Sequence, residues 1–386
     1  MLCGSQYRRT AHYHVTHRRR QNFYALPTAQ WQMLSAPPFN LFSNLEHVDD
    51  AIDANGDLAD EILNSALKSL GLEGLEADPN YLLMDWRDTA ESHHIDKARS
   101  TIRQLYRDWS AEGLAERQVC YGPVLEDLKQ EFAHLPDKSS VIVLVPGAGL
   151  GRLVFEIWRN GHTVEGNEIS WHQLIASNWL FNHTKGTSFD LYPFAAEFSN
   201  VIRRDHQLKV VKVPDVHVSS MLEDSSDPSS TGRVDLRAGD FISVYKNEQY
   251  RERFEAVVTV FFIDTAPNVI RYIETVRHCL RPGGVWINMG PLLWHFEDRR
   301  SPAINERTQT GESLDAQAGI QEPGSFELTD EEVVELVRQM GFDVESHEVS
   351  LEGVGYINNP ESMLQNTYRP SHWVARRRDK AGPSPS

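Results

Sequence analysis

The chain has 386 residues, 40% of them hydrophobic, which is enough for a sizeable core in one large domain with extensions or in two domains. Its 38 basic and 55 acidic side chains leave a net charge of −17, which weighs against a nucleic-acid-binding surface. No apolar run approaches the roughly 18 residues that cross a bilayer. Cys3, Cys120 and Cys279 lie far apart, without metal-ligand spacing, which favours a reduced intracellular protein with neither a disulfide framework nor a metal site.

Residues 5–135 are predicted to be mostly helical. Apolar spacing indicates four amphipathic segments. They run from Phe23 to Leu34 with a stop at Pro37-Pro38, from Leu45 to Leu75 with a break at 71–74, from Asp96 through Leu114, and from Tyr121 to Phe132. The stretch 8–20 is basic, and the first acidic residue is Glu46, so its composition fits either a mitochondrial presequence or a basic surface helix. We expect the surface helix.

From residue 141 onward strands and helices alternate, which is typical of a parallel α/β sheet. The predicted strands are 141–146, 162–168, 234–238, 254–263, 285–289, 342–350 and 372–376. The predicted helices are 152–160, 170–182, 268–280 and 329–340, the last with Thr329 and Glu332 as a capping box. Residues 185–235 are predicted to be irregular, 223–232 and 301–324 polar loops, and 379–386 a disordered tail. The strand 254–263 is expected to lie at the centre of the sheet.

The strand 141–146 leads directly into Gly147-Ala148-Gly149-Leu150-Gly151 and then into a helix. Glycine lets the backbone turn sharply and lets a ligand approach closely, and the helix N-terminus offers free N–H groups. The spacing G-x-G-x-G differs from the dinucleotide pattern G-x-G-x-x-G, which conflicts with an NAD-linked oxidoreductase.

Polar side chains follow the next two strands. Glu168 ends the second strand, about 20 residues after the glycines, where a carboxylate can accept hydrogen bonds from ribose hydroxyls. Asp240 and Phe241 follow the third strand and offer a polar group and an aromatic ring for adenine. In open α/β sheets, ligands bind at the carboxyl ends of the strands, where all three residues are expected. Each could also be an ordinary strand-end residue.

This ordered set resembles the S-adenosylmethionine-dependent methyltransferases with a Rossmann-like, seven-stranded α/β sheet. The turn at 281–284 (RPGG) is also similar to that class, whereas Val145-Pro146 stands where many members carry an acidic residue. Over a longer reach the chain resembles the carnosine N-methyltransferase family. That resemblance rests on VPGAGLGRL, GNEIS, LYPF, GDF, FFIDTA and GGVWINMGPLLWHF, and on TIRQLYRDWS at 101–110. It covers about residues 5–378, apart from the loops at 223–232 and 301–324.

The resemblance implies a helical region over residues 1–135 that closes over the cofactor site and a methyltransferase domain over 136–378. It implies S-adenosylmethionine as cofactor, with Gly147, Glu168, Asp240 and Phe241 among the residues that bind it. The other implied cofactor contacts are Gln104, Arg107 and Ala256. From the sequence alone Gln104 and Arg107 would be an ordinary solvated helix face. Arg107 could pair with the methionyl carboxylate.

The family methylates the imidazole nitrogen nearest the backbone, the pros nitrogen, of carnosine, giving anserine and S-adenosylhomocysteine. Neutral imidazole is already a fair nucleophile, so positioning is expected to supply most of the acceleration. Asp264 and His295, each following a strand, match the family's substrate-binding pair, and we expect both in catalysis. Asp264 could alternatively cap the helix at 268. Tyr368 and, more weakly, Tyr356 match substrate-binding tyrosines. The residues before Tyr368 are Asn366 and Thr367, so this chain has fewer aromatic residues there than the family.

Two alternatives stay open. One is a histidine methyltransferase that acts on another small peptide or on a protein. The smaller number of aromatic residues before Tyr368 is compatible with such a different substrate. The other is a catalytically silent module that binds the cofactor, against which the retained Asp264 and His295 argue. The expected partner is a small histidine-containing peptide, with no nucleic acid and no membrane, and a homodimer is left open. The expected compartment is the cytoplasm, with the nucleus as a second one.

Overall fold

The computed structural model describes residues 3–72, 92–223, 232–296 and 324–379. It divides into two compact units, neither of which is continuous in sequence. The first unit comprises residues 1–116, 171–224 and 355–366, and the second comprises 117–170, 225–354 and 367–386. The predicted boundaries at 135/136 and 378/379 are divisions along the chain, which this grouping in space does not test. The tail 380–386 and most of the two predicted polar loops lie outside the described residues.

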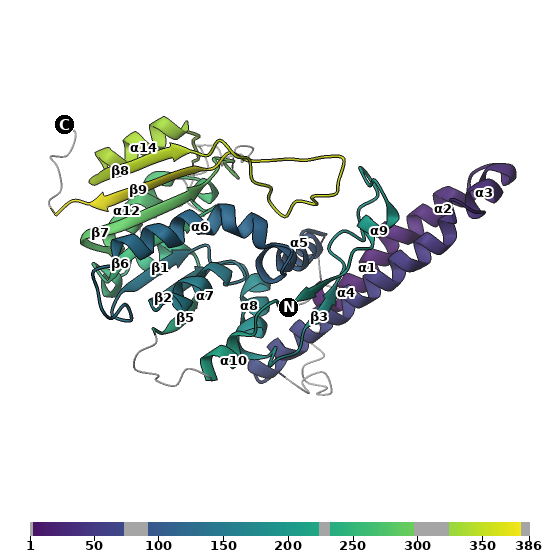
Figure 1. The fold of residues 1–386 in the computed structure, drawn as a ribbon, viewed down its shortest axis with the longest axis horizontal. Helices are drawn as coiled ribbons and strands as arrows, with labels where there is room; N and C mark the ends of the chain where they lie inside the picture. The colour runs from purple at the N-terminus through teal and green to yellow at the C-terminus, as the bar shows by residue number, and fades with distance from the viewer. Residues whose placement is uncertain (1–2, 73–91, 224–231, 297–323, 380–386) are drawn as a thin grey trace, which may run out of the picture. The chain divides into compact units, whose positions relative to one another are not determined.

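The second unit is built on a seven-stranded sheet (Figure 1) of order β5-β2-β1-β6-β7-β9-β8. The bounds are β1 Ile142–Pro146, β2 Thr163–Glu168, β5 Val234–Ala238, β6 Phe254–Val260, β7 Leu280–Gly290, β8 Phe342–Val349 and β9 Ser371–Arg377. Strands β5, β2, β1, β6 and β7 pair in parallel, whereas β9 pairs antiparallel with both β7 and β8. The predicted seven-stranded α/β fold is therefore confirmed, with β6 at its centre.

Helices of the second unit pack on this sheet. Their bounds are α7 Arg152–Arg159, α11 Phe241–Tyr245, α12 Val269–Cys279 and α14 Asp330–Gln339. Helix α7 packs on β1, β2 and β5, whereas α12 packs on β7 and α14 on β8. The core beneath α12 and α14 contains Trp286, Phe342 and Trp373, each at most 1% exposed. Burying an aromatic side chain of this size stabilises the fold by about 2–3 kcal/mol. The predicted capping box at Thr329 and Glu332 is present at the start of α14.

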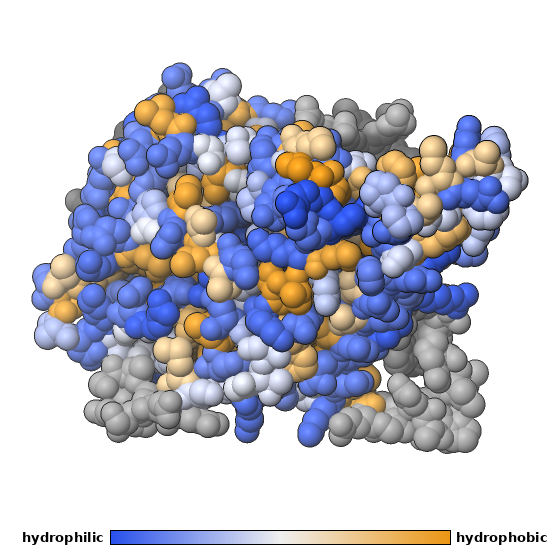
Figure 2. Space-filling view, turned by 45° about the vertical axis from the view of Figure 1, so that its right-hand side comes forward, coloured by the Kyte–Doolittle hydropathy of each residue, from blue (hydrophilic) through white to orange (hydrophobic). Residues whose placement is uncertain are grey.

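The first unit is mainly helical. Its elements are α1 Cys3–Ala11, the π-helix His12–His17, α2 Arg18–Tyr24, α3 Thr28–Ser35, α4 Leu41–Ser69, α5 Ser92–Trp109, α8 Trp171–Asn182, α9 Arg204–Gln207, α10 Val218–Glu223 and the antiparallel strands β3 Phe189–Leu191 and β4 Val211–Val213. In the described part of the chain, no helix is both long and apolar enough to cross a membrane. Hydrophilic residues dominate the face shown in Figure 2, with apolar residues between them.

Two sequence predictions about the elements were wrong. Residues 185–235, predicted to be irregular, contain β3, β4, α9 and α10. Three-residue strands are too short to show a period, so only their pairing across the chain defines them. The helix predicted through Leu114 ends at Trp109, and a new helix, α6 (Leu114–Glu131), begins well before the predicted start at Tyr121. The break lies at Gly113, where a Cβ atom would stand 2.2 Å from the backbone oxygen of Arg107.

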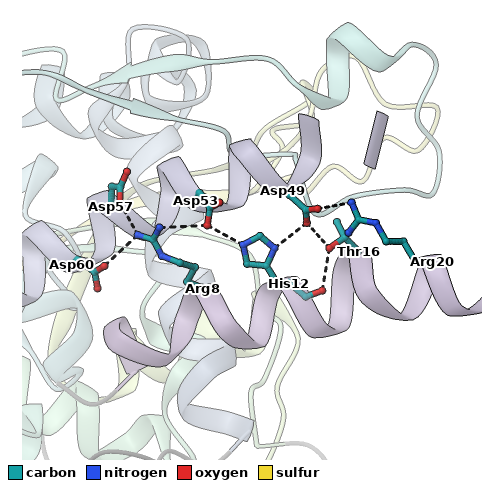
Figure 3. A network of polar contacts seen from close by, with 8 residues as sticks. All are labelled: Arg8, His12, Thr16, Arg20, Asp49, Asp53, Asp57 and Asp60. Carbon is teal, nitrogen blue, oxygen red and sulfur yellow. Dashed lines mark hydrogen bonds and ion pairs between the residues drawn. The ribbon is translucent and has the colours of Figure 1, made fainter. Parts of the chain in front are cut away.

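An ion-pair network joins the N-terminal helices to α4 (Figure 3). Arg8, His12, Thr16 and Arg20 recur every four residues and therefore share one helix face. Arg8 contacts Asp53, Asp57 and Asp60, whereas Arg20 donates to Asp49 at 2.6 Å. The order of these contacts runs in opposite directions along the two segments, so the segments are antiparallel. The basic stretch 8–20 thus supplies one side of a helix pair, as expected of a surface helix.

His12 lies between two carboxylates of this network. Its Nδ1 is 2.9 Å from Asp49 Oδ1 and its Nε2 is 2.9 Å from Asp53 Oδ1. Both nitrogens can donate only when the ring is protonated. Burial opposes this charge, but the hydrogen bonds to Asp53 and Asp49 outweigh it, and the pKa of His12 is raised above its ordinary value. The geometry and the pKa direction therefore agree on a protonated ring.

We expect His12→Gln to remove a pH-dependent part of the free energy of unfolding. The raised pKa means that the stabilisation by His12 is complete below about pH 6.5, the unfolded value, and is lost as pH rises through the folded pKa. Urea unfolding at pH 6 and pH 8.5 should show a loss of about 1 kcal/mol in the variant at pH 6 and a smaller loss at pH 8.5. His17→Gln, at an exposed position of the same π-helix, is the control. An equal loss at both pH values would contradict the protonated bridge.

Candidate active site

The glycine loop between β1 and α7 has the backbone that its sequence predicts. Gly147, Gly149 and Gly151 have φ of 68°, 57° and 79°, in the left-handed region that favours glycine. A Cβ at Gly147 would stand 2.6 Å from the ring of Phe262, so the loop lies directly against that residue. Beside Gly149 there is open space instead. The two glycines therefore serve different ends: close packing at Gly147, and an unobstructed backbone at Gly149.

Glu168 joins the end of β2 to this loop. Its Oε2 accepts the N–H of Gly149 at 2.9 Å, and its Oε1 accepts the N–H of Ser170 at 2.7 Å. The residue is 7% exposed, and burial raises the pKa of its carboxyl although both N–H groups favour the anion. A carboxylate has about four lone-pair sites, so Glu168 can accept hydrogen bonds besides those from Gly149 and Ser170. The acceptor pair and the open backbone of Gly149 fit the ribose of an adenosyl ligand.

Asp240 and Phe241 each make contacts that stabilise the second unit itself. Asp240 Oδ1 accepts the N–H of Ser243 at 2.9 Å and caps α11. The Phe241 ring is buried against Phe262 and Tyr272, with centroids 5.5 and 5.4 Å away. Both residues follow β5, next to the end of β2, as the sequence predicts. Their contact with adenine stays a prediction.

Ala256 lies inside the sheet rather than at its edge. It is fully buried in β6, opposite Val143 of β1 and Val285 of β7. The last residue of the strand, partly exposed at its carboxyl end, is Val260. A cofactor contact at Ala256 therefore stays a prediction, and the strand position that reaches the edge is Val260.

Asp264 links the ends of β6 and β7. It is 3% exposed, its Oδ2 accepts the N–H of Leu293 at 2.9 Å, and its backbone oxygen accepts the N–H of His295 at 3.1 Å. Burial raises the pKa of the Asp264 carboxyl, while the Leu293 N–H and the charge of His295 act in the opposite direction. The alternative role of a helix cap belongs to another residue, because Asn268 accepts the N–H of Ile270 at the start of α12.

His295 is exposed and follows a strained backbone position. The residue before it, Trp294, has φ of 47°, which is rare for an aromatic residue. Its indole N–H donates to the backbone oxygen of Leu328 at 3.1 Å and holds the segment in place. The predicted pair Asp264 and His295 is therefore brought together through backbone contacts, with one member buried and the other open to solvent.

Tyr368 is held in the same unit by backbone pairing with Val354, with hydrogen bonds of 2.8 Å in both directions. Its ring meets that of Phe261 edge to face, with centroids 6.3 Å apart. Phe261 was not singled out from the sequence, although it precedes Asp264 by only three residues. Its φ of 53° at the end of β6 turns the chain away from the strand. The site edge thus has an aromatic residue that the motif FFIDTA already contained.

Three predicted residues lie in the first unit: Gln104, Arg107 and Tyr356. Gln104 is 7% exposed and accepts a 2.6 Å hydrogen bond from Gln173, so the solvated helix face is wrong. Arg107 forms two hydrogen bonds to Asp108, at 2.7 and 2.9 Å, and its guanidinium lies 4.7 Å from the centre of the Tyr356 ring. A cation over an aromatic face is attracted by the ring's quadrupole. Contacts of these residues with the cofactor or the peptide stay predictions.

The second unit brings Gly147, Glu168, Asp240 and Asp264 to one edge of the sheet. They follow β1, β2, β5 and β6, which are parallel and therefore end on the same side. At this edge the carboxylate of Glu168 lies beside the glycine loop, and the buried carboxylate of Asp264 follows a strand two positions away in the sheet. Such an arrangement can hold a nucleoside and orient a second molecule beside it.

Comparisons with known proteins agree on one family. The carnosine N-methyltransferase family matches residues 84–379. The carnosine N-methyltransferase of Schizosaccharomyces pombe is 35% identical over 373 residues, covering 96% of this chain and 92% of that protein. The enzyme of the same name from Rattus norvegicus is 34% identical over 374 residues, covering 96% and 84%.

Solved structures are more distant. A carbon methyltransferase is 14% identical, with a TM-score of 0.41 over 92% of this chain and 72% of that one, a likeness too low to support a conclusion. The sequence relatives and the family match are decisive. The chain belongs to the carnosine N-methyltransferase family.

Proposed function

We propose that this protein transfers the methyl group of S-adenosylmethionine to the pros nitrogen of the histidine ring in carnosine, giving anserine and S-adenosylhomocysteine. The observation that carries the proposal is the buried carboxylate of Asp264, a residue that follows the central strand and whose backbone oxygen accepts the N–H of His295. Relatives that are named carnosine N-methyltransferases and match 96% of this chain support the choice of substrate.

The residues proposed to hold S-adenosylmethionine in the second unit are Gly147, Glu168, Asp240 and Phe241. The cofactor supplies an electrophilic methyl group on a sulfonium. Glu168 is suited to accept hydrogen bonds from the ribose, because the N–H groups of Gly149 and Ser170 hold its carboxylate beside the glycine loop. In the first unit, Gln104 and Arg107 are proposed as further cofactor residues.

Asp264 is proposed to select the nitrogen that reacts. A neutral imidazole carries its proton on one nitrogen, and a carboxylate that accepts this N–H leaves the other nitrogen with a free lone pair. If Asp264 accepts the N–H of the far nitrogen, the pros nitrogen is the nucleophile. The anion also stabilises the positive charge that develops on the ring as the methyl group is transferred. His295, Tyr368 and Tyr356 are proposed to position the rest of the peptide.

The wider setting is also a proposal. We propose a small histidine-containing peptide as the partner, with no nucleic acid and no membrane, and leave a homodimer open. The cytoplasm, with the nucleus as a second compartment, is the proposed location. Cys120 and Cys279 are both buried, and Cys279 is a free thiol, which supports a reducing compartment.

The test is transfer from methyl-labelled S-adenosylmethionine to carnosine, with NMR used to establish which ring nitrogen carries the label. We expect label on the pros nitrogen alone. Carnosine already methylated at that nitrogen is the matched control and should accept no label. Transfer to another histidine peptide or to a protein, but not to carnosine, would replace the substrate. Cofactor binding without transfer to any of them would contradict an enzymatic role.

A further inference from the structure

The loop 355–366 of the first unit contains a backbone position that needs outside support. Ile357 has φ of 54°, a conformation that β-branched residues rarely adopt, and it lies next to Tyr356. Such strain persists only where the surrounding structure holds the residue in place. The rest of the loop is anchored elsewhere, by the pairing of Ser362 with Val201 and by the hydrogen bond from Met363 to Asn200.

Two charged side chains from outside the loop form hydrogen bonds with both polar backbone groups of Ile357, its N–H and its carbonyl oxygen. The Glu116 carboxylate accepts the N–H of Ile357 at 2.9 Å through Oε1 and the N–H of Asn358 at 3.3 Å through Oε2. The Arg103 guanidinium donates to the carbonyl oxygen of Ile357 at 3.2 Å. We call Glu116 and Arg103 the backbone clamp. Hydrogen bonds to charged groups are stronger than those between neutral groups, so the clamp can hold a strained residue.

The clamp is built locally by the turn between α5 and α6. The chain turns at residues 110–113, where the Ser110 hydroxyl donates to Tyr106 O at 2.6 Å and accepts the Gly113 N–H at 3.1 Å. Glu116 then falls in the first turn of α6, where the helix dipole favours a carboxylate. Arg107, one turn after Arg103 on α5, lies over the Tyr356 ring. Both neighbours of Ile357 are thus contacted from this segment: Tyr356 by Arg107 of α5, and Asn358 by Glu116 of α6.

We propose that Glu116 is a positioning residue for the peptide substrate: with Arg103 it clamps the backbone of Ile357 and so holds Tyr356 in its binding orientation. This role rests on the proposed function, because it takes Tyr356 as a peptide-binding residue. Glu116 acts through the loop and does not itself touch the substrate. The chemistry at Asp264 does not depend on it.

The test compares Glu116→Ala and Glu116→Gln with the wild-type protein, using Glu112→Gln as the matched control. Glu112 is an exposed glutamate four residues away. Loss of the carboxylate should raise the KM for carnosine about tenfold in Glu116→Ala and less in Glu116→Gln, which keeps one acceptor. The Kd for S-adenosylmethionine, measured by calorimetry, and kcat should change less than about twofold. Glu112→Gln should match the wild type.

A second readout does not depend on turnover. Hydrogen–deuterium exchange of the peptide that contains residues 355–366 should be about tenfold faster in Glu116→Ala at the Ile357 and Asn358 amides. Because Glu116 acts through Tyr356, the KM of the double variant with Tyr356→Leu should be no higher than that of the worse single variant. An unchanged KM, an equal loss of cofactor affinity, or additive effects in the double variant would overturn the clamp. A wild-type protein that methylates no histidine peptide would instead overturn the proposed function, and the peptide role of the clamp with it.

Discussion

Asp264→Asn is expected to lower kcat/KM for carnosine by about 10²- to 10³-fold, the range for loss of a group that stabilises charge in the transition state. Asparagine keeps an oxygen that can accept the Leu293 N–H, so the turn after β6 should survive. It lacks the negative charge that stabilises the developing imidazolium. The Kd for S-adenosylmethionine should therefore stay within about twofold of the wild type, because the glycine loop and Glu168 are untouched.

The control for this variant is Asp343→Asn. Asp343 lies in β8 and forms a surface ion pair with Arg378, which contributes little to stability. It should leave both constants unchanged. Protonation of the carnosine imidazole should lower the rate of both enzymes at acidic pH. Since burial raises the pKa of Asp264, the wild-type rate should fall further as pH drops through that pKa, and the Asn variant should lack only this additional fall. Equal losses of catalysis and cofactor affinity in Asp264→Asn would refute the role given to the carboxylate.

Gly149→Ala is expected to weaken binding of S-adenosylmethionine about tenfold or more, a change of at least about 1.4 kcal/mol. Two causes act together. At φ of 57° an alanine is strained, and its Cβ would occupy the open space beside the loop in which the ligand is proposed to lie. Calorimetric titration with S-adenosylhomocysteine measures the loss without turnover.

Gly283→Ala separates these two causes. Gly283 has φ of 74° and, like Gly149, open space where a Cβ would stand, but it lies in β7, where the register with β6 shifts. Both variants should lose about 1–2 kcal/mol of unfolding free energy from backbone strain. Only Gly149→Ala should lose cofactor affinity. If Gly283→Ala weakens binding equally, the loss reflects general destabilisation and the glycine loop is not the cofactor site.

Much of the site could be predicted because its residues stand at the ends of strands that are visible in the sequence. The buried run before Gly147, the strand ending in Glu168 and the apolar run before Asp264 each show a local pattern. Parallel strands then bring their carboxyl ends to one edge. Ala256 shows no such local pattern and is expected only from the family resemblance. It is buried inside β6, whose last residue is Val260, and its contact with the cofactor stays a prediction.

The sequence by itself determined the seven strands of the main sheet, the glycine loop and the family, because these depend on neighbouring residues and on motifs read along the chain. Only the tertiary structure decided that Glu168 holds Gly149, that Asp264 holds Leu293 and that Glu116 holds Ile357. The partners in these pairs are 19, 29 and 241 residues apart. Periodicity reports only on local structure, whereas a hydrogen bond between distant residues exists only once packing has placed both groups.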